Sequence, residues 1–154
     1  MHSFDDSRFL PYTPRQLFDL VADIAKYPEF LPWCLGARVG ARTPEGDHEI
    51  VMADLIVGTR IFRETFTSRV TLSPEAVPPA ISAAYVKGPM RHMENRWRFV
   101  PEGEGTRLEF HVAFEFRSAL LEKMMGAFFD DAQRRMIAAF EARAAVLYGR
   151  GTGA

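Results

Sequence analysis

The chain has 154 residues, of which 47% are apolar and 25% are charged, and its formal net charge at pH 7 is −1. A chain of this length and composition is long enough for one globular domain with a sizeable core. The near-zero net charge argues against general nucleic-acid binding, DNA binding included, because such domains are usually strongly basic. The single cysteine, Cys34, excludes an internal disulfide and a cysteine-rich metal centre.

The first quarter of the chain predicts one strand and a capped helix. Residues 3–10 are the expected strand. Thr13, Pro14 and Gln16 then supply an N-cap, a first-turn proline and a capping box, which predict a helix ending near Ala25. The N-terminus lacks the apolar run of a secretory signal, so a cytoplasmic location is expected.

An aromatic segment, residues 27–34, follows this helix. Two prolines four residues apart forbid a long helix, so the segment is expected to form a short helical turn. So many apolar side chains in a loop have two interpretations: a plug that closes one end of the core, or a gate over the mouth of a cavity. A gate could also touch a bilayer, because aromatic side chains favour the membrane interface. The candidate gate residues are Pro28, Phe30, Leu31 and Trp33.

From Gly36 onward the apolar pattern has a period of two, which is typical of strands. In residues 106–116, apolar side chains alternate with Arg107, Glu109 and His111. One buried face and one wet face are typical of an antiparallel sheet. Turn residues separate the predicted strands, which cover residues 37–41, 48–57, 60–72, 81–86, 92–100 and 106–116.

The last third of the chain predicts one long amphipathic helix. Ser118 is the expected N-cap and Gly149 the expected C-terminal stop. About 30 residues at ~1.5 Å each would make a helix of roughly 45 Å, which needs a partner surface of similar length. Its apolar stripe consists of residues at spacings of three and four, namely Leu121, Met124, Met125, Phe128, Phe129, Ala132, Met136, Phe140 and Leu147.

The order of elements predicts an α+β helix-grip fold, in which a curved antiparallel sheet of about seven strands wraps around the C-terminal helix. Two short helical segments follow the first strand. Residues 1–149 are expected to form a single domain, and residues 150–154 a frayed tail. A sheet that curls around one helix leaves an apolar space between the two layers, where a ligand can bind.

Residues suited to catalysis or metal binding are sparse. The four histidines, His2, His48, His92 and His111, show no ligand spacing to one another or to the cysteine. The thiol would need a nearby base to act as a nucleophile, and a buried structural thiol is the simpler interpretation. No glycine-rich phosphate loop follows a strand. The sequence therefore predicts no catalytic residue, no metal site and no catalytic cofactor, and hence a protein that is not an enzyme.

Two polar residues lie in phase with apolar strand faces. Glu64 alternates with Phe62 and Phe66, and Asn95 is in phase with Trp97. If these faces point to the helix, each polar group needs a hydrogen-bond partner, because an unsatisfied buried group costs ~1–3 kcal/mol. The partner is either local backbone at a bulge or the polar head group of a ligand.

Five arginines fall on the opposite, outer phase of the strands, interleaved with glutamates. A mixed solvated face is one interpretation. A docking surface for membrane phosphates or ribosomal RNA is the other. These arginines are Arg63, Arg69, Arg96, Arg98 and Arg107.

Several segments resemble the coenzyme Q-binding START-like family, part of the polyketide cyclase/START superfamily. The similarity runs from about Phe9 to Tyr148. Met90 and Met93 stand where the family pattern has Phe and Leu. Both substitutions keep an apolar side chain but make the lining of the expected binding site more flexible. The similar segments are residues 27–34 (YPEFLPWC), Gly88-Pro89, Asn95-Arg96-Trp97, Phe114-Glu115-Phe116, Phe128-Phe129 and residues 139–143 (AFEAR).

The resemblance implies a START/Bet v 1-like helix-grip fold with an apolar tunnel. For the coenzyme Q-binding members it implies ubiquinone binding that supports respiration and quinone biosynthesis, without catalysis. Ribosome-association toxins of the RatA type belong to the same group and imply an alternative, binding to the large ribosomal subunit and blocking of subunit association. Aromatase/cyclase enzymes share the fold and are a third alternative, although fold alone does not determine function.

The residue pattern and the resemblance together predict binding of ubiquinone or a related isoprenoid lipid, with the inner membrane surface and the ribosome as further candidate partners. A protonated Glu64 and Asn95 would donate to the carbonyls of the head group, and apolar side chains would hold the tail. The candidate ligand-binding residues are Phe62, Glu64, Phe66, Asn95, Trp97, Phe99, Phe114, Phe116, Met125 and Phe128.

Overall fold

The computed structural model describes residues 1–58 and 63–149. Over these residues the chain forms eight strands, three α-helices and one short 3₁₀-helix. In chain order they are β1 (His2–Leu10), α1 (Pro14–Ala22), η1 (Ile24–Glu29), β2 (Cys34–Val39), β3 (Thr43–Glu45), β4 (His48–Gly58), β5 (Arg63–Ser73), β6 (Ala80–Lys87), β7 (Met90–Glu102), β8 (Gly105–Phe116), α2 (Ala119–Gly126) and α3 (Phe129–Tyr148).

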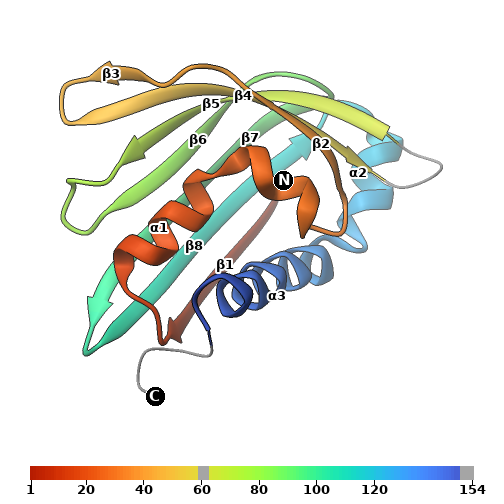
Figure 1. Cartoon of the computed structure of the whole chain (residues 1–154). Helices are drawn as coiled ribbons and strands as arrows, with labels where there is room; N and C mark the ends of the chain where they lie inside the picture. Colours follow the sequence, from red (N-terminus) through yellow and green to blue (C-terminus); the bar gives the residue numbers. More distant parts are fainter. Residues whose placement is uncertain (59–62, 150–154) are drawn as a thin grey trace.

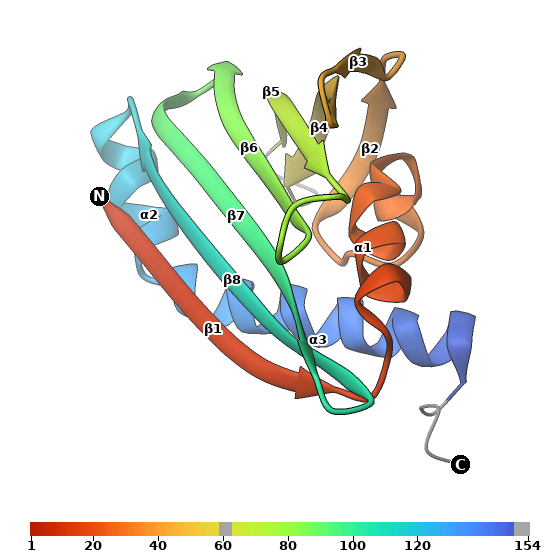
Figure 2. The ribbon, with the colours of Figure 1, turned by 90° about the vertical axis from the view of Figure 1, so that its left-hand side faces the viewer.

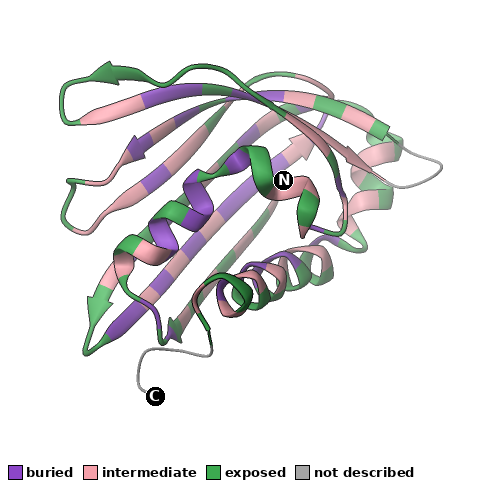
Figure 3. Ribbon diagram, viewed as in Figure 1, coloured by how far each residue is buried: buried purple, intermediate pink, exposed green. Residues whose placement is uncertain are grey.

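The strands form one antiparallel sheet in the order β1-β8-β7-β6-β5-β4-β2, and β3 pairs with β4. The sheet is strongly curved, and α1, η1 and α3 all lie on its concave side (Figures 1 and 2). Along most of β8, buried residues alternate with half-buried ones because successive side chains point to opposite faces of the sheet (Figure 3). The predicted α+β helix-grip architecture is confirmed.

The strands differ from the prediction most clearly at β3 and at the start of β2. The stretch at Thr43–Glu45, which overlaps a predicted turn, is a short strand, because the turn needs only Gly46 and Asp47. Gly46 has a φ of 67°, a left-handed conformation that favours glycine. The strand β2 begins earlier than expected, at Cys34. The first part of the predicted strand 60–72, including Phe62, lies outside the described residues.

The N-terminal helix starts as predicted. Thr13 accepts a hydrogen bond from the Gln16 backbone, and the Gln16 side chain accepts one from the Thr13 backbone. The helix ends at Ala22, earlier than expected, because Asp23 leaves the helical region with φ −85° and ψ 65°. The chain then continues as η1, which holds Pro28.

The C-terminal helix is not one piece, so the prediction of a single helix over residues 118–149 is wrong. Ser118 caps α2, and Gly149 ends α3 with a φ of 83°, as predicted. Between the two helices the chain turns at Ala127 and Phe128 (Figure 2). Gly126 lies just before this turn and close to β1, since a Cβ there would lie 2.5 Å from the His2 ring.

Because of the break, the apolar residues of α2 and α3 do not form one continuous buried stripe. The buried residues of α3 are Phe129, Met136, Ile137, Phe140 and Ala144. Phe128, by contrast, is 67% exposed, and Met124 and Leu147 are exposed as well. The prediction that Phe128 lies between sheet and helix is therefore wrong, because the apolar stripe of the sequence continues across a point where the helix does not.

Candidate functional site

The inner, concave face of the sheet has a filled region under α3. The Trp97 ring packs against Phe110 at 4.4 Å and against Phe140 of α3 at 5.1 Å between ring centroids. Phe99 is completely buried and meets Phe18 of α1 at 5.5 Å. Trp97 and Phe99, both predicted to line a tunnel, are thus core side chains that join the sheet to the helices.

Two further predicted ligand-binding residues are also buried in the core. Phe114 packs against Phe129, the first residue of α3, at 4.6 Å and against Phe116 at 5.2 Å. The His2 ring contacts Phe114 at 5.8 Å from the edge strand. These contacts fill the space where β8 leads into α2.

Other side chains of the inner face are only half-buried, and they lie on the adjacent strands β4, β5, β6 and β7. Leu55 lies opposite Phe66, and Ala83 lies opposite Asn95, in the strand register. We call the half-buried set Leu55, Phe66, Ala83, Tyr85 and Asn95 the inner patch.

Half-buried side chains from two other segments pack against the same core. Trp33 lies beside the end of β4, where its carbonyl accepts a hydrogen bond from the Gly58 backbone. Leu121 and Met125 come from the inner side of α2. Of the predicted apolar ligand-binding residues, Phe66 and Met125 are therefore those with accessible surface on the inner side.

Polar groups accompany the inner patch. Asn95 is half-buried between Ala83 and Val112 of the neighbouring strands, and Glu64 is half-buried opposite Val57. The Trp33 indole Nε1 is buried and has no hydrogen-bond partner among the described residues. A buried N–H group requires a hydrogen-bond acceptor, because a buried donor without one lowers the stability of the folded state.

The turn between β6 and β7 approaches the inner patch closely. Gly88 has a φ of 146°, and a Cβ there would lie 2.8 Å from the Phe66 Cβ. Only glycine therefore fits, and the Gly88-Pro89 pair sets the position of the Phe66 ring. The Tyr85 hydroxyl accepts a hydrogen bond of 3.1 Å from the Met90 backbone, which orients the Tyr85 ring in the same region.

Sequence reasoning missed Leu55 and Tyr85 as candidates and treated Trp33 only as a gate. Their signal was available, because Leu55 and Tyr85 share the inner phase of their strands with Ala53 and Ala83. The alternation along a strand shows on which side of the sheet a side chain lies, but it does not show how much of that side chain the helices cover.

The aromatic segment, residues 27–34, is closed against α3. Phe30 meets Phe140 at 5.1 Å, and Arg143 lies over the Phe30 ring at 5.3 Å. Leu31 is buried in the core. Arg143 also pairs with Glu29 at 3.0 Å, and hydrogen bonds from Lys26 and Arg143 hold the pKa of that carboxyl below its usual range. In this structure the segment packs as a plug.

Cys34, the last residue of this segment, is buried. Its Sγ donates to the Gly36 carbonyl at 3.6 Å, and burial raises the pKa of the thiol. A raised pKa keeps the thiol protonated at neutral pH, so the sulfur is not an activated nucleophile. No group of three or more His, Cys, Asp or Glu within the described part of the chain is arranged to hold a metal ion.

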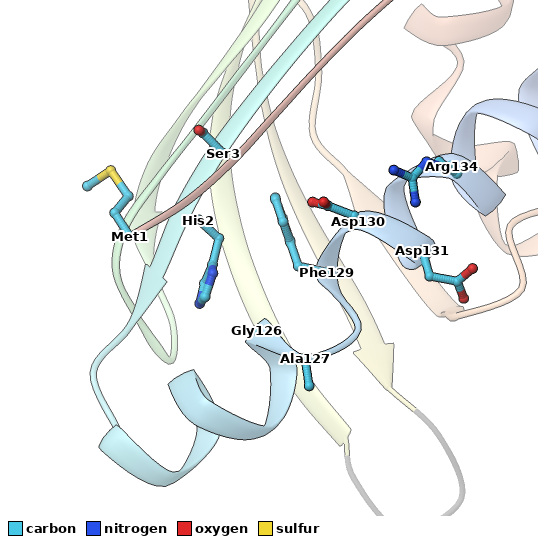
Figure 4. A pocket seen from close by; sticks show the side chains of 9 residues that line it. All are labelled: Met1, His2, Ser3, Gly126, Ala127, Phe129, Asp130, Asp131 and Arg134. Atoms are coloured by element: carbon cyan, nitrogen blue, oxygen red, sulfur yellow. The ribbon is translucent and has the colours of Figure 1, made fainter.

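Two hollows lie at the surface beside α3. The larger, of about 560 Å³, opens between the start of β1 and the α2–α3 turn (Figure 4). It is lined by Met1, His2, Ser3, Gly126, Ala127, Phe129, Asp130, Asp131 and Arg134. The smaller, of about 350 Å³, is lined by Phe9, Leu10, Pro11, Tyr12, Ala138, Glu141, Ala142 and Ala145. Neither set includes a predicted ligand-binding residue.

The outer face carries the predicted arginines, and most of them are paired. Arg69 pairs with Glu45 at 3.4 Å, Arg98 with Glu109 at 2.6 Å and Arg107 with Glu102 at 3.0 Å. Arg96 is exposed and forms no ion pair among residues 1–58 and 63–149. Much of the basic charge is thus neutralised, as expected for a mixed solvated face.

Within the described residues, no helix is long and apolar enough to cross a membrane.

Comparisons with known proteins agree with this geometry. The family described as polyketide cyclase / dehydrase and lipid transport matches residues 10–141. The ribosome association toxin RatA of Rickettsia prowazekii is 38% identical over 146 residues, which cover 94% of this chain and 97% of the toxin. The coenzyme Q-binding protein COQ10 homolog B, mitochondrial, of Xenopus laevis is 32% identical over 152 residues, which cover 96% of this chain and 59% of that protein.

Solved structures share the fold over nearly the whole chain. The 18 kDa protein CC1736 from Caulobacter crescentus has a TM-score of 0.80 and 43% identity, over 97% of this chain and 99% of its own. The Zhui aromatase/cyclase from a Streptomyces species has a TM-score of 0.76 and 19% identity, over 98% of this chain and 99% of its own. The enzyme therefore shares the fold, and the likeness reaches no further.

Proposed function

Because the chain belongs to the polyketide cyclase / dehydrase and lipid transport family, we propose that it binds ubiquinone or a related isoprenoid lipid at the inner patch and catalyses no reaction. The half-burial of the inner patch carries this proposal. Leu55, Phe66 and Tyr85 face the concave side of the sheet, yet the helices cover them only in part. Covering such surface contributes roughly 25 cal/mol per Å², and an isoprenoid tail has the chemistry to cover it.

The polar groups beside the inner patch fit a quinone head. A quinone carbonyl only accepts hydrogen bonds, so its partners must be donors. The Trp33 indole N–H lacks an acceptor among the described residues, and the Asn95 amide carries two N–H donors. The Glu64 carboxyl at the end of β5 would be a third donor group only in its protonated form.

The relatives support a binding protein. One is named a coenzyme Q-binding protein and another a ribosome association toxin, and neither name describes an enzyme.

Tryptophan fluorescence tests the proposal directly. Titration of the purified protein with decyl-ubiquinone is expected to quench the emission saturably at one ligand per chain. The Trp33 backbone is hydrogen-bonded to Gly58 of β4, three residues after Leu55, and Trp97 lies in the core under α3. Trp33→Phe should therefore remove most of the quenching and leave the Trp97 emission. Quenching that rises linearly without saturation would contradict the proposal.

Ribosome association is a second candidate function. Its support is the 38% identity to a protein named a ribosome association toxin, over nearly the full length of both chains. The exposed Arg96 supplies an unneutralised charge at the centre of the outer face. Co-sedimentation with large ribosomal subunits tests this candidate, and Arg96→Glu should reduce it if the outer face is the contact. Either function is compatible with a cytoplasmic protein.

A further inference from the structure

The short helix α2 turns an apolar face to the outside. At about 100° per residue, one half of its circumference carries Ala119, Leu120, Lys123, Met124 and Ala127, and Phe128 follows on the same side. All six are exposed, and only Lys123 is polar. Leu120 is 67%, Met124 53% and Phe128 67% exposed. We call Leu120, Met124 and Phe128 the α2 ridge.

The orientation of α2 is fixed by its other side. Leu121 and Met125 face inward and pack against the core. Glu122 accepts a hydrogen bond of 2.6 Å from the Phe116 backbone and pairs with His2 of β1. The α2 ridge therefore cannot turn inward without breaking these contacts.

Four basic residues surround the same end of the sheet: Lys87, Arg91, Arg117 and Lys123. All are exposed, and none forms an ion pair within the described chain. The Arg117 Nε donates to the Met90 carbonyl at 3.0 Å, which brings the β8–α2 connection against the β6–β7 turn. Figure 2 shows that turn and α2 at one end of the molecule, away from the C-terminus. We call these four residues the basic collar.

Acidic side chains near the basic collar are largely engaged elsewhere. Glu115 lies 3.8 Å from the amino group of Met1, and Glu122 pairs with His2. Asp131 of α3 pairs with Arg135. Asp130 is exposed in the same turn of α3 and forms no ion pair with any described residue. This end is therefore locally positive although the net charge of the chain is −1.

From this combination we propose that the α2 ridge and the basic collar dock the protein on a bilayer that contains anionic lipids. An amphipathic helix binds the interface by burying apolar side chains, while nearby Lys and Arg attract anionic head groups. An RNA surface would use the cations but would leave Leu120 and Met124 in water. Leu121 and Met125 of α2 pack against the same core cluster as the apolar residues of the inner patch, so docking would bring the proposed lipid site near the membrane.

Flotation with vesicles tests the proposal without any quinone, so its outcome is independent of the proposed ligand. The vesicles contain phosphatidylcholine with about one third phosphatidylglycerol, or phosphatidylcholine alone. The wild-type protein should float with the anionic vesicles only. Leu120→Ser with Met124→Ser should reduce the bound fraction about tenfold, because both side chains are exposed in the free protein and buried in the bilayer.

Charge variants and controls complete the test. Arg91→Glu with Lys123→Glu should weaken binding about tenfold and flatten its salt dependence. Val146→Ser with Leu147→Ser is the matched apolar control, since both residues are exposed on α3 at the C-terminal end. Arg15→Glu, on the exposed side of α1, is the charge control. Both controls should float like wild type.

Three results would overturn the proposal. The first is a wild-type protein that does not float with anionic vesicles. The second is equal flotation of the α2 ridge variant and wild type. The third is loss of binding to large ribosomal subunits in the α2 ridge variant while no form of the protein floats, which would assign this face to the ribosome.

Discussion

Replacing Phe140 with alanine is expected to lower the free energy of unfolding by about 4 kcal/mol, the typical cost of deleting a buried aromatic ring. The Phe140 ring joins three parts of the molecule: it meets Tyr27 at 5.3 Å, Phe30 at 5.1 Å and Trp97 at 5.1 Å. Its loss would leave a cavity between α3, η1 and the sheet. Urea denaturation followed by circular dichroism measures the change.

Phe128→Ala is the matched control, with the same substitution at the other end of the apolar stripe. Phe128 is 67% exposed, so the expected change is within about 0.5 kcal/mol. The sequence pattern alone predicts the opposite ranking, because it places Phe128 between sheet and helix. Equal destabilisation by both variants would mean that the break between α2 and α3 is wrong.

Replacing Leu55 and Phe66 together with alanine is expected to weaken quinone binding about a hundredfold, since each truncation removes roughly 1.4 kcal/mol of apolar contact. The two residues face each other in the register of β4 and β5 at the centre of the inner patch. Titration with decyl-ubiquinone measures the affinity. Both residues are only half-buried, so the folded structure should persist and the loss should appear in binding rather than in folding.

Phe9→Ala is the control for this pair. Phe9 is 46% exposed on the outer phase of β1, away from the inner patch. Its removal should leave the quinone affinity unchanged. An unchanged affinity in the Leu55 and Phe66 variant would place the ligand elsewhere and would remove the basis of the proposed site.

Much of the fold follows from local sequence signals. The period-two pattern of residues 106–116 predicts an antiparallel strand with one buried and one more accessible face, and β8 has that form. The capping box at Thr13 and Gln16 and the positive φ at Gly149 occur as predicted, because both depend on a few neighbouring residues. Signals of this kind need no knowledge of the tertiary structure.

The break in the C-terminal helix could not be predicted from periodicity. The apolar spacing continues through Gly126 and Phe128, and a glycine within a helix is tolerated at a cost of ~1 kcal/mol. The packing at this point is long-range, because the His2 ring of β1 lies against Gly126. A contact between residues so far apart in the sequence is visible only in the folded structure.

For the candidate site, the sequence indicates which side of the sheet a residue faces but not how deeply it is buried. Alternation places Phe66, Asn95 and Trp97 on one face of the sheet, and the structure agrees. It does not show which of them α3 covers. Trp97 is buried against Phe140, whereas Phe66 keeps accessible surface, and this difference depends on where α3 crosses the sheet.

Mass spectrometry of organic extracts is the most direct test of ligand binding. The protein would be purified from a ubiquinone-producing bacterium, alongside the variant in which Leu55 and Phe66 are alanine. The proposed function predicts about one ubiquinone or related isoprenoid per wild-type chain and none in the variant. A well-folded wild-type protein whose extract contains no isoprenoid lipid would contradict it.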